Sequence, residues 1–432
     1  MSKISRILKD AKNALNSVSG LFYYHSFCTD SDKLKEYISI FDHVKDSRIP
    51  AKCSYSARDI IAVVFLALLD ERHGWNEIED YCYDHREMLS LFTDFDGVFP
   101  SHDTFCRVFS LLNTDDLQKA VVSFLCQCIE SVASAVSVDS NSKVKVIAMD
   151  GKEERGSGRK YDTDEKVMNA QIMHFYDTDT EICISSALID DKTNEIPTAQ
   201  SVLRTLNIKG MVITADAMNA QKETVQVICN GKGHYVLGLK GNHKGLHEDV
   251  AAEFAKTEAK GRIQSTKNYH KMETEKNHNQ VEIREYFLLP ASKFYQEDDW
   301  QNIRSVVMYK KTMYNIITKK ESVERRYYIS DLTKVNLISE CIRTHWSVEN
   351  GLHWHLDTSF YEDANSTMNK KALHNLSVIN KMVLTLIKLM APLFRNGSVK
   401  RTQKSFRSHY EENVLKMFIF LQGKDLQKIF KK

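Results

Sequence analysis

The sequence predicts an α/β fold, in which a mixed sheet flanked by helices follows an N-terminal helical domain and contains a β-rich insertion. Three observations support this prediction. Apolar residues recur at helical spacing between residues 31 and 137. From residue 144 onward, apolar runs and amphipathic segments follow the order β-β-β-α-β-α-β-α, which is typical of α/β domains. Between about 262 and 330 the chain is polar and rich in strand-forming residues.

The N-terminal part is expected to hold several helices. Residues 1–30 are a variable N-terminus, which lacks the apolar core of a signal peptide. Breaks are expected near Gly74 and at 97–100, and Ser101 is expected to cap the next helix. A further helix is expected at 117–136, before a polar linker. The longest apolar run, at 60–69, is about half the length of a membrane span, so we expect no membrane segment and a cytoplasmic location.

The α/β domain is expected to span residues 144–390. Its first strand, VKVIAMD, ends on Asp150, and a hairpin that turns at 178–180 follows. Next come a helix at 196–207 with Pro197 in its first turn, a strand at 211–217, a helix at 221–231, a strand at 234–240 and a helix at 247–260. After the insertion, helices are expected at 336–360 and 370–390, and a basic C-terminal tail at 391–432.

Composition excludes some classes of protein. Apolar residues at 42% and charged residues at 27% describe an ordinary globular chain. The nine cysteines contain no CxxC pair, which argues against a zinc ribbon. A net charge of +2 does not by itself indicate nucleic acid. The basic run at 395–407 is either a solvated tail or a contact for a phosphate backbone.

Two acids follow predicted strands of the α/β domain. Asp150 comes after VKVIAM and Asp216 after MVITA. Ligand and catalytic groups gather at the carboxyl ends of strands in such sheets. Each aspartate alone could equally be a turn former or a helix cap, because its side chain readily accepts local backbone hydrogen bonds. The pair leaves the catalytic and the structural interpretation open.

A third acid, Glu349, lies in RTHWSVENGLHWHLD. In a helix, His345, Glu349, His353 and Leu356 would share one face, flanked by Trp346 and Asp357. The alternative is a half-buried amphipathic helix with tryptophan in the core and glutamate at the surface. The HxH pair, His353 and His355, is not expected to bind one metal jointly, since alternate helical residues point to different faces.

Three carboxylates are the ligands that two-metal phosphoryl chemistry needs. Mg²⁺ takes oxygen ligands and completes its shell with water and substrate phosphate. Two such ions about 3.5–4 Å apart activate the attacking oxygen and stabilise the leaving one, without a protein nucleophile.

Several blocks of the sequence carry a resemblance to a known family. They are AMDGKEERGSGR (148–159), DDKTNEIP (190–197), VITADAMNAQKETVQVICNGKGHYVLGLKGNH (212–243), IRTHWSVENGLHWHLDTSFYEDAN (342–365) and, nearer the N-terminus, FPSHDTFCRVFSLLN (99–113). The chain resembles transposases of bacterial insertion sequences, of the ribonuclease-H-like DDE superfamily, and among them the ISAs-type branch with the H-repeat-associated proteins. The resemblance covers about residues 30 to 410.

The resemblance implies a ribonuclease-H-like catalytic domain and a DDE transposase that cleaves and joins DNA. It implies that Asp150, Asp216 and Glu349 are catalytic and bind two ions, Mg²⁺ or Mn²⁺. The expected partners are the inverted-repeat DNA of the transposon ends and target DNA, bound by a homodimer, with the protein in the cytoplasm and associated with the nucleoid. The alternatives are a domesticated DNA-binding relative without transposition, and a metal-dependent DNA nuclease.

The chain departs from the family near the third acid. The wider superfamily often has a tyrosine-arginine-glutamate-lysine signature there, but His345 stands four residues before Glu349 and Leu356 seven after it. Arg343 is a substitute for the basic group, and Lys370 and Lys371 replace an expected arginine, although lysine lacks the bidentate fork. The residues expected to contact DNA are Lys152, Arg155, Lys240, Asn242, Arg343, His345, Trp346, His353, Lys370 and Lys371.

Overall fold

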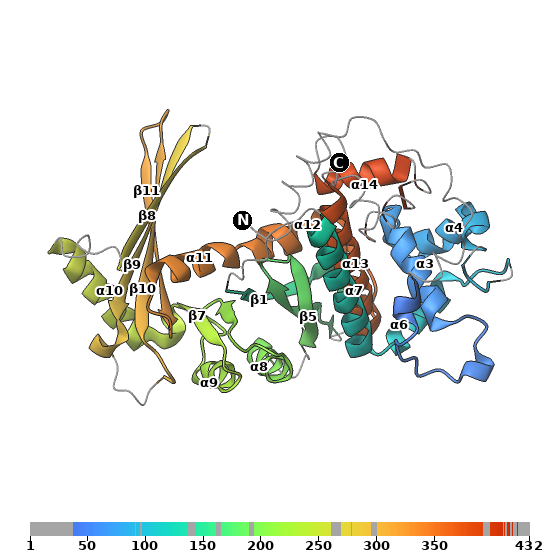
Figure 1. Ribbon diagram of the computed structural model, residues 1–432, viewed down its shortest axis with the longest axis horizontal. Coiled ribbons are helices and arrows are strands. Elements are labelled where there is room, and N and C mark those ends of the chain that lie inside the picture. The colour runs from blue at the N-terminus through green and yellow to red at the C-terminus, as the bar shows by residue number, and fades with distance from the viewer. Residues whose placement is uncertain are drawn as a thin grey trace.

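A computed structural model of the chain shows a long sheet with helices on both faces (Figure 1). The structure describes residues 38–90, 92–95, 97–135, 144–160, 166–189, 194–260, 269–277, 279–294, 300–391, 398–408, 410, 413, 414, 417 and 421. The predicted variable N-terminus, the polar linker at 137–143 and residues 190–193 of the DDKTNEIP block therefore lie outside the described residues.

The N-terminal region is helical, as predicted, and its helices begin at local capping groups. The hydroxyl of Ser56 accepts the backbone N–H of Asp59 at the start of the first long helix, and Glu77 accepts the N–H groups of His73 and Gly74 at the predicted break. Ser101 precedes a helix as predicted, but its hydroxyl bonds the Thr104 side chain instead of a backbone N–H. The elements are η1 (Ser39–Phe41), η2 (Pro50–Lys52), α3 (Ala57–Leu69), α4 (Trp75–Asp84), α5 (Arg86–Leu89), α6 (His102–Leu111) and α7 (Thr114–Ala135).

The predicted mixed sheet is present, and it has nine strands in the order β5-β4-β1-β6-β7-β11-β10-β9-β8. The pairs β1–β6 and β6–β7 are parallel, and the other neighbours are antiparallel. Its strands are β1 (Val146–Glu154), β4 (Ala170–Asp177), β5 (Ile182–Ile189), β6 (Val212–Ala215), β7 (His234–Leu239), β8 (His270–Asn277), β9 (Gln280–Pro290), β10 (Ser305–Asn315) and β11 (Glu321–Ser330). A small ladder joins β2 (Arg159–Lys160) to β3 (Lys166–Val167).

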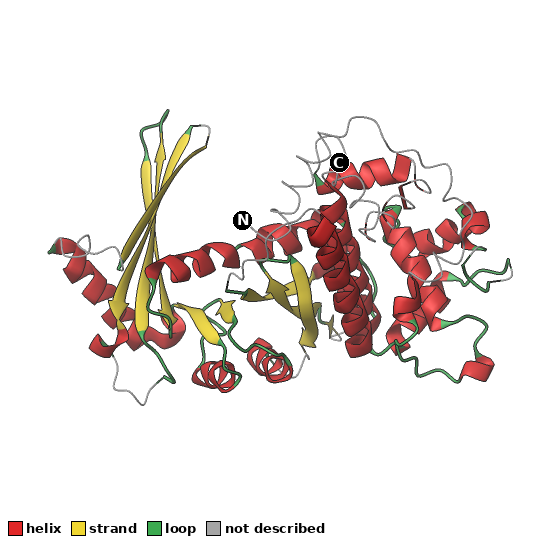
Figure 2. Ribbon diagram, in the orientation of Figure 1, coloured by secondary structure: helices red, strands yellow, loops and turns green. Residues whose placement is uncertain are grey.

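One expectation about the strands needs correction. The first strand does not end on Asp150, because β1 continues to Glu154 and pairs with β4 along that extension. The region at 262–330 is rich in strands, as predicted. Its strand β11 pairs with β7, so β8–β11 continue the central sheet and extend past the helices as a long ribbon (Figure 2).

Helices cover the two faces of the sheet, and strand alternation decides which side chains meet them. On one face Ile147 and Met149 of β1 pack in the cluster that contains α8 (Glu195–Thr205), α9 (Lys222–Asn230) and α10 (Lys244–Ala259). On the other face Val146 and Val212 pack against α11 (Val335–His345). The remaining elements are η3 (Arg155–Ser157), η4 (Gly241–His243), η6 (Ala291–Lys293), a π-helical segment (Glu349–His353), α12 (Trp354–Ser359), η8 (Glu362–Ala364), α13 (Lys370–Met390) and α14 (Val399–Ser408).

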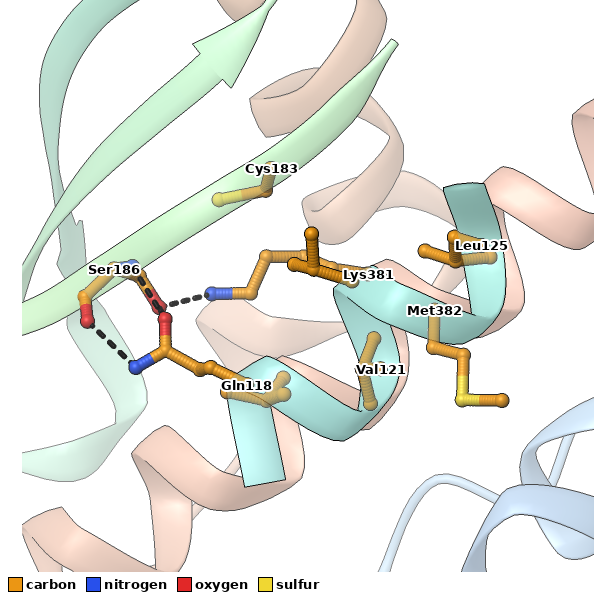
Figure 3. Close-up of a pocket in the computed structure, with 9 residues that line it drawn as sticks. Gln118, Val121, Leu125, Cys183, Ser186, Lys381 and Met382 are labelled. Atoms are coloured by element: carbon orange, nitrogen blue, oxygen red, sulfur yellow. Dashed lines mark hydrogen bonds between the residues drawn. The ribbon is translucent and has the colours of Figure 1, made fainter. Parts of the chain in front are cut away.

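The N-terminal helices share one core with α13 and with one end of the sheet. Helix α13 is buried along nearly its whole length and lies beside α7 (Figure 1). At this junction the side-chain amide of Gln118 bonds both backbone groups of Ser186 in β5, and the ammonium of Lys381 donates to the Ser186 hydroxyl at 3.0 Å (Figure 3). These contacts fix the helical domain on the edge of the sheet.

The described residues of the predicted basic tail pack on one side against the N-terminal helices. Helix α14 buries Val399 and Phe406, and the Tyr410 hydroxyl donates to the Leu66 carbonyl oxygen at 2.6 Å. Its basic side chains Lys400, Arg401, Lys404 and Arg407 are exposed, so a solvated surface and a phosphate contact both remain open. In the described part of the chain, no helix is both long and apolar enough to cross a membrane.

Candidate active site

Alternation along two parallel strands brings the first two acids to one face of the sheet. Asp150 has the same parity as Val146, and Asp216 the same as Val212, and both valines face α11. Parallel pairing of β1 with β6 ends at Met149 and Ala215, directly before the two acids. The predicted positions at the carboxyl end of the parallel pair are thus observed, although β1 itself runs on.

The third acid approaches this face from the helix above. The chain from α11 to α12 crosses the sheet (Figure 1), and it widens into a π-helical turn that begins at Glu349. Val348 and Leu352 are buried in the core, whereas Glu349 is exposed. π-Bulges are rare and occur mostly at functional sites, because they re-aim side chains within a helix.

Four carboxylates converge at Asp150. Burial, and then Glu349, Asp216 and Glu195 in that order, raise the pKa of Asp150 to about 7. Burial and Asp216 also raise the pKa of Glu195, while its hydrogen bond from Asn219 lowers it. The three predicted acids and Glu195 are therefore near enough to one another to interact electrostatically.

Glycine permits the approach of this fourth acid. A Cβ atom at Gly151 would lie 2.9 Å from the Glu195 carboxylate, so any larger residue would require this flexible side chain to shift. Glu195 begins α8 and lies in the KTNEIP segment, where the sequence resemblance already pointed without assigning the residue a role. From the sequence alone, an acid between a loop and a helix is normally interpreted as one that stabilises the N-terminal turn of the helix.

These carboxylates suit a hard divalent cation. No described lysine or arginine lies within ion-pair distance of Asp150, Asp216, Glu195 or Glu349, and the nearest basic group, His353, is a neutral imidazole. The charge is therefore uncompensated by protein. Among the described residues, no group of three histidine, cysteine or acidic side chains has the spacing to hold a metal ion as it stands. Mg²⁺ commonly binds through one or two carboxylates plus water and phosphate, which fits such an open group.

The loop after β6 holds Asp216 in place. One oxygen of its carboxylate accepts the backbone N–H groups of Met218 and Asn219 at 3.1 and 3.4 Å. The amide of Asn242 donates to the Ala217 carbonyl oxygen at 2.5 Å. Asn242, which the sequence suggested as a DNA contact, therefore braces this loop, while Lys240 is exposed beside it.

The two histidines of the predicted helix face both reach the site. The Nδ1 atom of His345 is 2.9 Å from the Thr214 hydroxyl, and burial lowers the pKa of His345 to about 4. His353 has one ring nitrogen 3.6 Å from Asp150 and the other 3.1 Å from His174. His355 lies elsewhere, near Lys388 and Glu181, as expected from its position on the helix. His345 and His353 are both partly buried, and contact of either residue with DNA stays a prediction.

Lys152 does not lie where a phosphate could reach it. Its side chain is 6% exposed and its ammonium contacts Glu154 at 3.0 Å and Asp357 at 2.8 Å, with Glu362 and Asp363 at 3.6 Å. The expected DNA contact is therefore replaced by a structural one, because four carboxylates already surround the charge. Lys152 instead connects the strand of the first acid to the segment that follows the helix of the third.

The remaining residues that the sequence suggested as DNA contacts differ in their exposure to solvent. Arg155 is 76% exposed and only loosely paired with Asp363 at 3.6 Å, and Lys371 is exposed at the start of α13. Lys370 is partly buried at the same place. Arg343 pairs with Glu273 and Glu275 of β8, and the guanidinium of Arg326 covers one face of the Trp346 ring at 4.3 Å.

Arg343 and Trp346 line a groove of about 480 Å³ between the extended strands and α11. Each basic group in it has an acidic neighbour, as in the pairs Arg284–Glu282 and Arg326–Glu324, both at 2.6 Å. The groove therefore has little net charge. Its lining residues are Glu282, Arg284, Tyr286, Tyr309, Lys311, Glu324, Arg326, Ile342, Arg343, Trp346, Ser347 and Asn350.

The repulsion at Asp150 predicts a gain of stability when its charge is removed. The pKa of about 7 lies above the ordinary 3.8, so the folded protein keeps a proton that the unfolded chain loses. Stability of the metal-free protein therefore falls as pH rises from about 4 to 7. We expect Asp150→Asn to raise the thermal unfolding midpoint by roughly a few degrees above pH 7, and by less towards pH 4. Scanning calorimetry in chelator would measure this, and equal midpoints at all pH values would contradict it.

Comparison with known proteins places this geometry in a family. Residues 141–386 match the family described as the transposase DDE domain, and residues 38–125 match its associated domain. The H repeat-associated protein YhhI of Escherichia coli strain K12, named a candidate transposase, is 28% identical over 379 residues, which are 86% of this chain and 94% of that protein. YncI of Escherichia coli O157:H7, also named a candidate transposase, is 28% identical over 391 residues, or 88% and 94% of the two chains.

A solved structure is also similar, at a greater distance. The piggyBac transposase synaptic complex with hairpin DNA matches with a TM-score of 0.35 and 11% identity, over 100% of this chain and 82% of that one. This likeness is too weak to carry an argument about fold or function. The family match covers more than half of the chain and includes Asp150, Asp216 and Glu349, so the chain belongs to the DDE transposase family.

Proposed function

We propose that this transposase serves an insertion sequence and that it cleaves and joins DNA at the ends of its element with two divalent ions, Mg²⁺ or Mn²⁺. The observation that carries the proposal is the group of uncompensated carboxylates around Asp150, on the carboxyl side of a parallel strand pair. The strand order β5-β4-β1-β6-β7, with β1–β6–β7 parallel, supports a ribonuclease-H-like core. The strands β8–β11 are the extension of that core.

The roles of the three acids follow from their positions. Asp150 is close to both Asp216 and Glu349, so it is the acid that two ions would share, with Asp216 on one side and Glu349 on the other. When bound, the ions lower the pKa of an attacking water or hydroxyl and neutralise charge on the phosphate and the leaving oxygen. The turn that holds Asp216 and the π-helical turn that aims Glu349 keep the carboxylates oriented without protein nucleophiles.

DNA is the partner that the family and the site support. The substrate would be the inverted repeats of the element's ends, and then target DNA, with a homodimer bringing two ends together. Water attack at the end of the element leaves a 3′-hydroxyl, and this hydroxyl attacks the target phosphate at the same acids. Each step exchanges one P–O bond for another, so no oxidant, reductant or covalent protein intermediate is needed.

The test uses purified full-length protein and labelled DNA that carries the inverted repeats flanking the gene. With Mg²⁺, we expect nicking at the repeat boundary, and we expect a pre-cut end to become joined to a target plasmid. Binding without nicking would favour a domesticated DNA-binding relative. Nicking without joining of the pre-cut end would favour a metal-dependent nuclease.

The exposed basic groups beside the acids give a separate prediction about DNA binding. Arg155 and Lys240 are exposed next to the first and second acids. We expect Arg155→Gln and Lys240→Gln each to weaken binding similarly for all sequences, and to reduce the slope of log affinity against log salt by about 0.9, because each loses one phosphate contact.

The matched control is Lys209→Gln. Lys209 is equally exposed but precedes β6, so it lies at the end of the sheet opposite Asp216. Fluorescence anisotropy over a range of salt concentrations would give the slopes. An unchanged slope in both variants, or the same change in the Lys209 variant, would contradict the contact.

A further inference from the structure

His353 and His174 form a buried histidine pair directly behind the first acid. Nδ1 of His353 is 3.6 Å from a carboxylate oxygen of Asp150, and its Nε2 is 3.1 Å from Nδ1 of His174. His174 lies in β4 exactly opposite Asp150 in the strand register, so both side chains emerge on the same face of the sheet. The Asp150 carboxylate, the His353 imidazole and the His174 imidazole thus neighbour one another in that order.

We propose that His353, through Nδ1, is a nitrogen ligand of the ion that Asp150 binds, and that His174 is the positioning residue that orients His353. This inference rests on the proposed metal-dependent function. It adds a nitrogen donor to a site whose other protein donors are carboxylate oxygens. It also gives a role to the two histidines, which the proposed function of the three acids does not explain.

The separation of the two groups suits a shared ion better than a hydrogen bond. At 3.6 Å, Nδ1 of His353 and the Asp150 oxygen are too far apart for a good hydrogen bond. Two ligands at about 2.1 Å from one ion, at right angles to each other, are about 3 Å apart. The two donors would have to approach each other by about 0.6 Å to bind one ion. The His353 side chain is only 13% exposed, so water does not readily replace it.

His174 gives His353 the partner that metal-bound histidines need. A ligating imidazole usually donates its other N–H to a fixed acceptor, which sets the tautomer and the ring orientation. If Nε2–H of His353 donates to Nδ1 of His174, the lone pair on Nδ1 of His353 faces Asp150.

An ordinary packing role leaves one observation unexplained. His174 is fully buried, and its Nε2 atom has no hydrogen-bond partner among the described residues. An isolated buried polar nitrogen costs about 1–3 kcal/mol, so an apolar residue would serve the strand better if packing were its only role. His345 differs, because its Nδ1 atom is already bonded to the Thr214 hydroxyl.

The test measures the ligands of bound Mn²⁺ by pulsed electron paramagnetic resonance on the full-length protein. We expect ¹⁴N modulation from a directly bound imidazole in the wild type, and its replacement by a ¹⁵N pattern when only histidine is ¹⁵N-labelled, which needs no substitution. His353→Asn should remove the nitrogen signal. The matched control His355→Asn, two residues along the same helix and away from Asp150, should retain it.

The role of His174 has its own measurement. We expect His174→Asn to weaken Mn²⁺ binding about 10–100-fold, as losses of such supporting partners do. Mn²⁺ binding that depends on Asp150 but shows no histidine nitrogen coupling would overturn this inference and leave the proposed function intact. Absence of Asp150-dependent Mn²⁺ binding would overturn both.

Discussion

Asp216→Asn is expected to lower end cleavage and strand joining by at least about 10³-fold, with DNA binding unchanged. Asparagine has nearly the shape of aspartate, and its side-chain oxygen can still accept the N–H groups of Met218 and Asn219, so the turn after β6 should persist. What is lost is one negative charge at a site built to hold cations. The measurement is single-turnover cleavage of labelled end DNA and joining of a pre-cut end.

A matched control is available in the same sheet. Asp177 ends β4 and also accepts two backbone N–H groups, from Asp179 at 3.0 Å and Thr180 at 3.3 Å. Its partner across the ladder is Ile147, so it lies near the opposite end of β1 from Asp150. Asp177→Asn should keep full activity. Strand joining at the wild-type rate by the Asp216 variant would remove the metal-dependent interpretation of this site.

The helices and the order of strands could be predicted because their causes are local. Helix α9 ends at Gly231 and the β4–β5 hairpin turns at residues 178–180, as the sequence indicates. The extension of β1 beyond Asp150 was not predicted, because KEE is too polar to suggest a strand. Its charges are satisfied partly within the strand, where Lys152 contacts Glu154, and partly by groups from distant segments, such as Asp357 and Glu362. The pairing of β11 with β7 is likewise non-local, and no pattern within either strand specifies it.

In the candidate site, too, local features could be predicted from the sequence and non-local ones could not. The spacing of His345, Glu349 and His353 along one helix predicts correctly that they approach the same region. His174 could not be found in this way, since a single histidine within the apolar strand QIMHFY looks like a core residue. Only the register between β4 and β1 places it against Asp150. The burial of Lys152 could not be predicted either, because its partners Asp357 and Glu362 come from a segment about 200 residues later.

Because Lys152 is buried, its substitution is expected to change the stability of the fold strongly. Glu154 and Glu362 are almost completely buried, at 0% and 2% exposure, and Lys152 contacts both. Burial and the neighbouring Glu362 raise the pKa of Glu154. Burial opposes ionisation of Glu362 too, but Lys152 and Lys381 outweigh it and lower the pKa of Glu362. The pair therefore holds one proton, on Glu154, and the lysine compensates the charge that remains.

Lys152→Met is expected to destabilise the fold by about 3–5 kcal/mol, because it leaves a buried carboxylate without its cation. Lys145→Met, in the exposed lysine just before the same strand, should cost less than about 0.5 kcal/mol. Because the raised pKa already keeps Glu154 protonated, Glu154→Gln should be mild and should not rescue Lys152→Met. Glu362→Gln removes the remaining charge, so the double variant with Lys152→Met should recover much of the loss. The denaturant midpoints of these variants measure the coupling between Lys152 and the two glutamates. A Lys152→Met midpoint equal to that of Lys145→Met would show that the Lys152 ammonium does not hold β1 to the segment beyond α12.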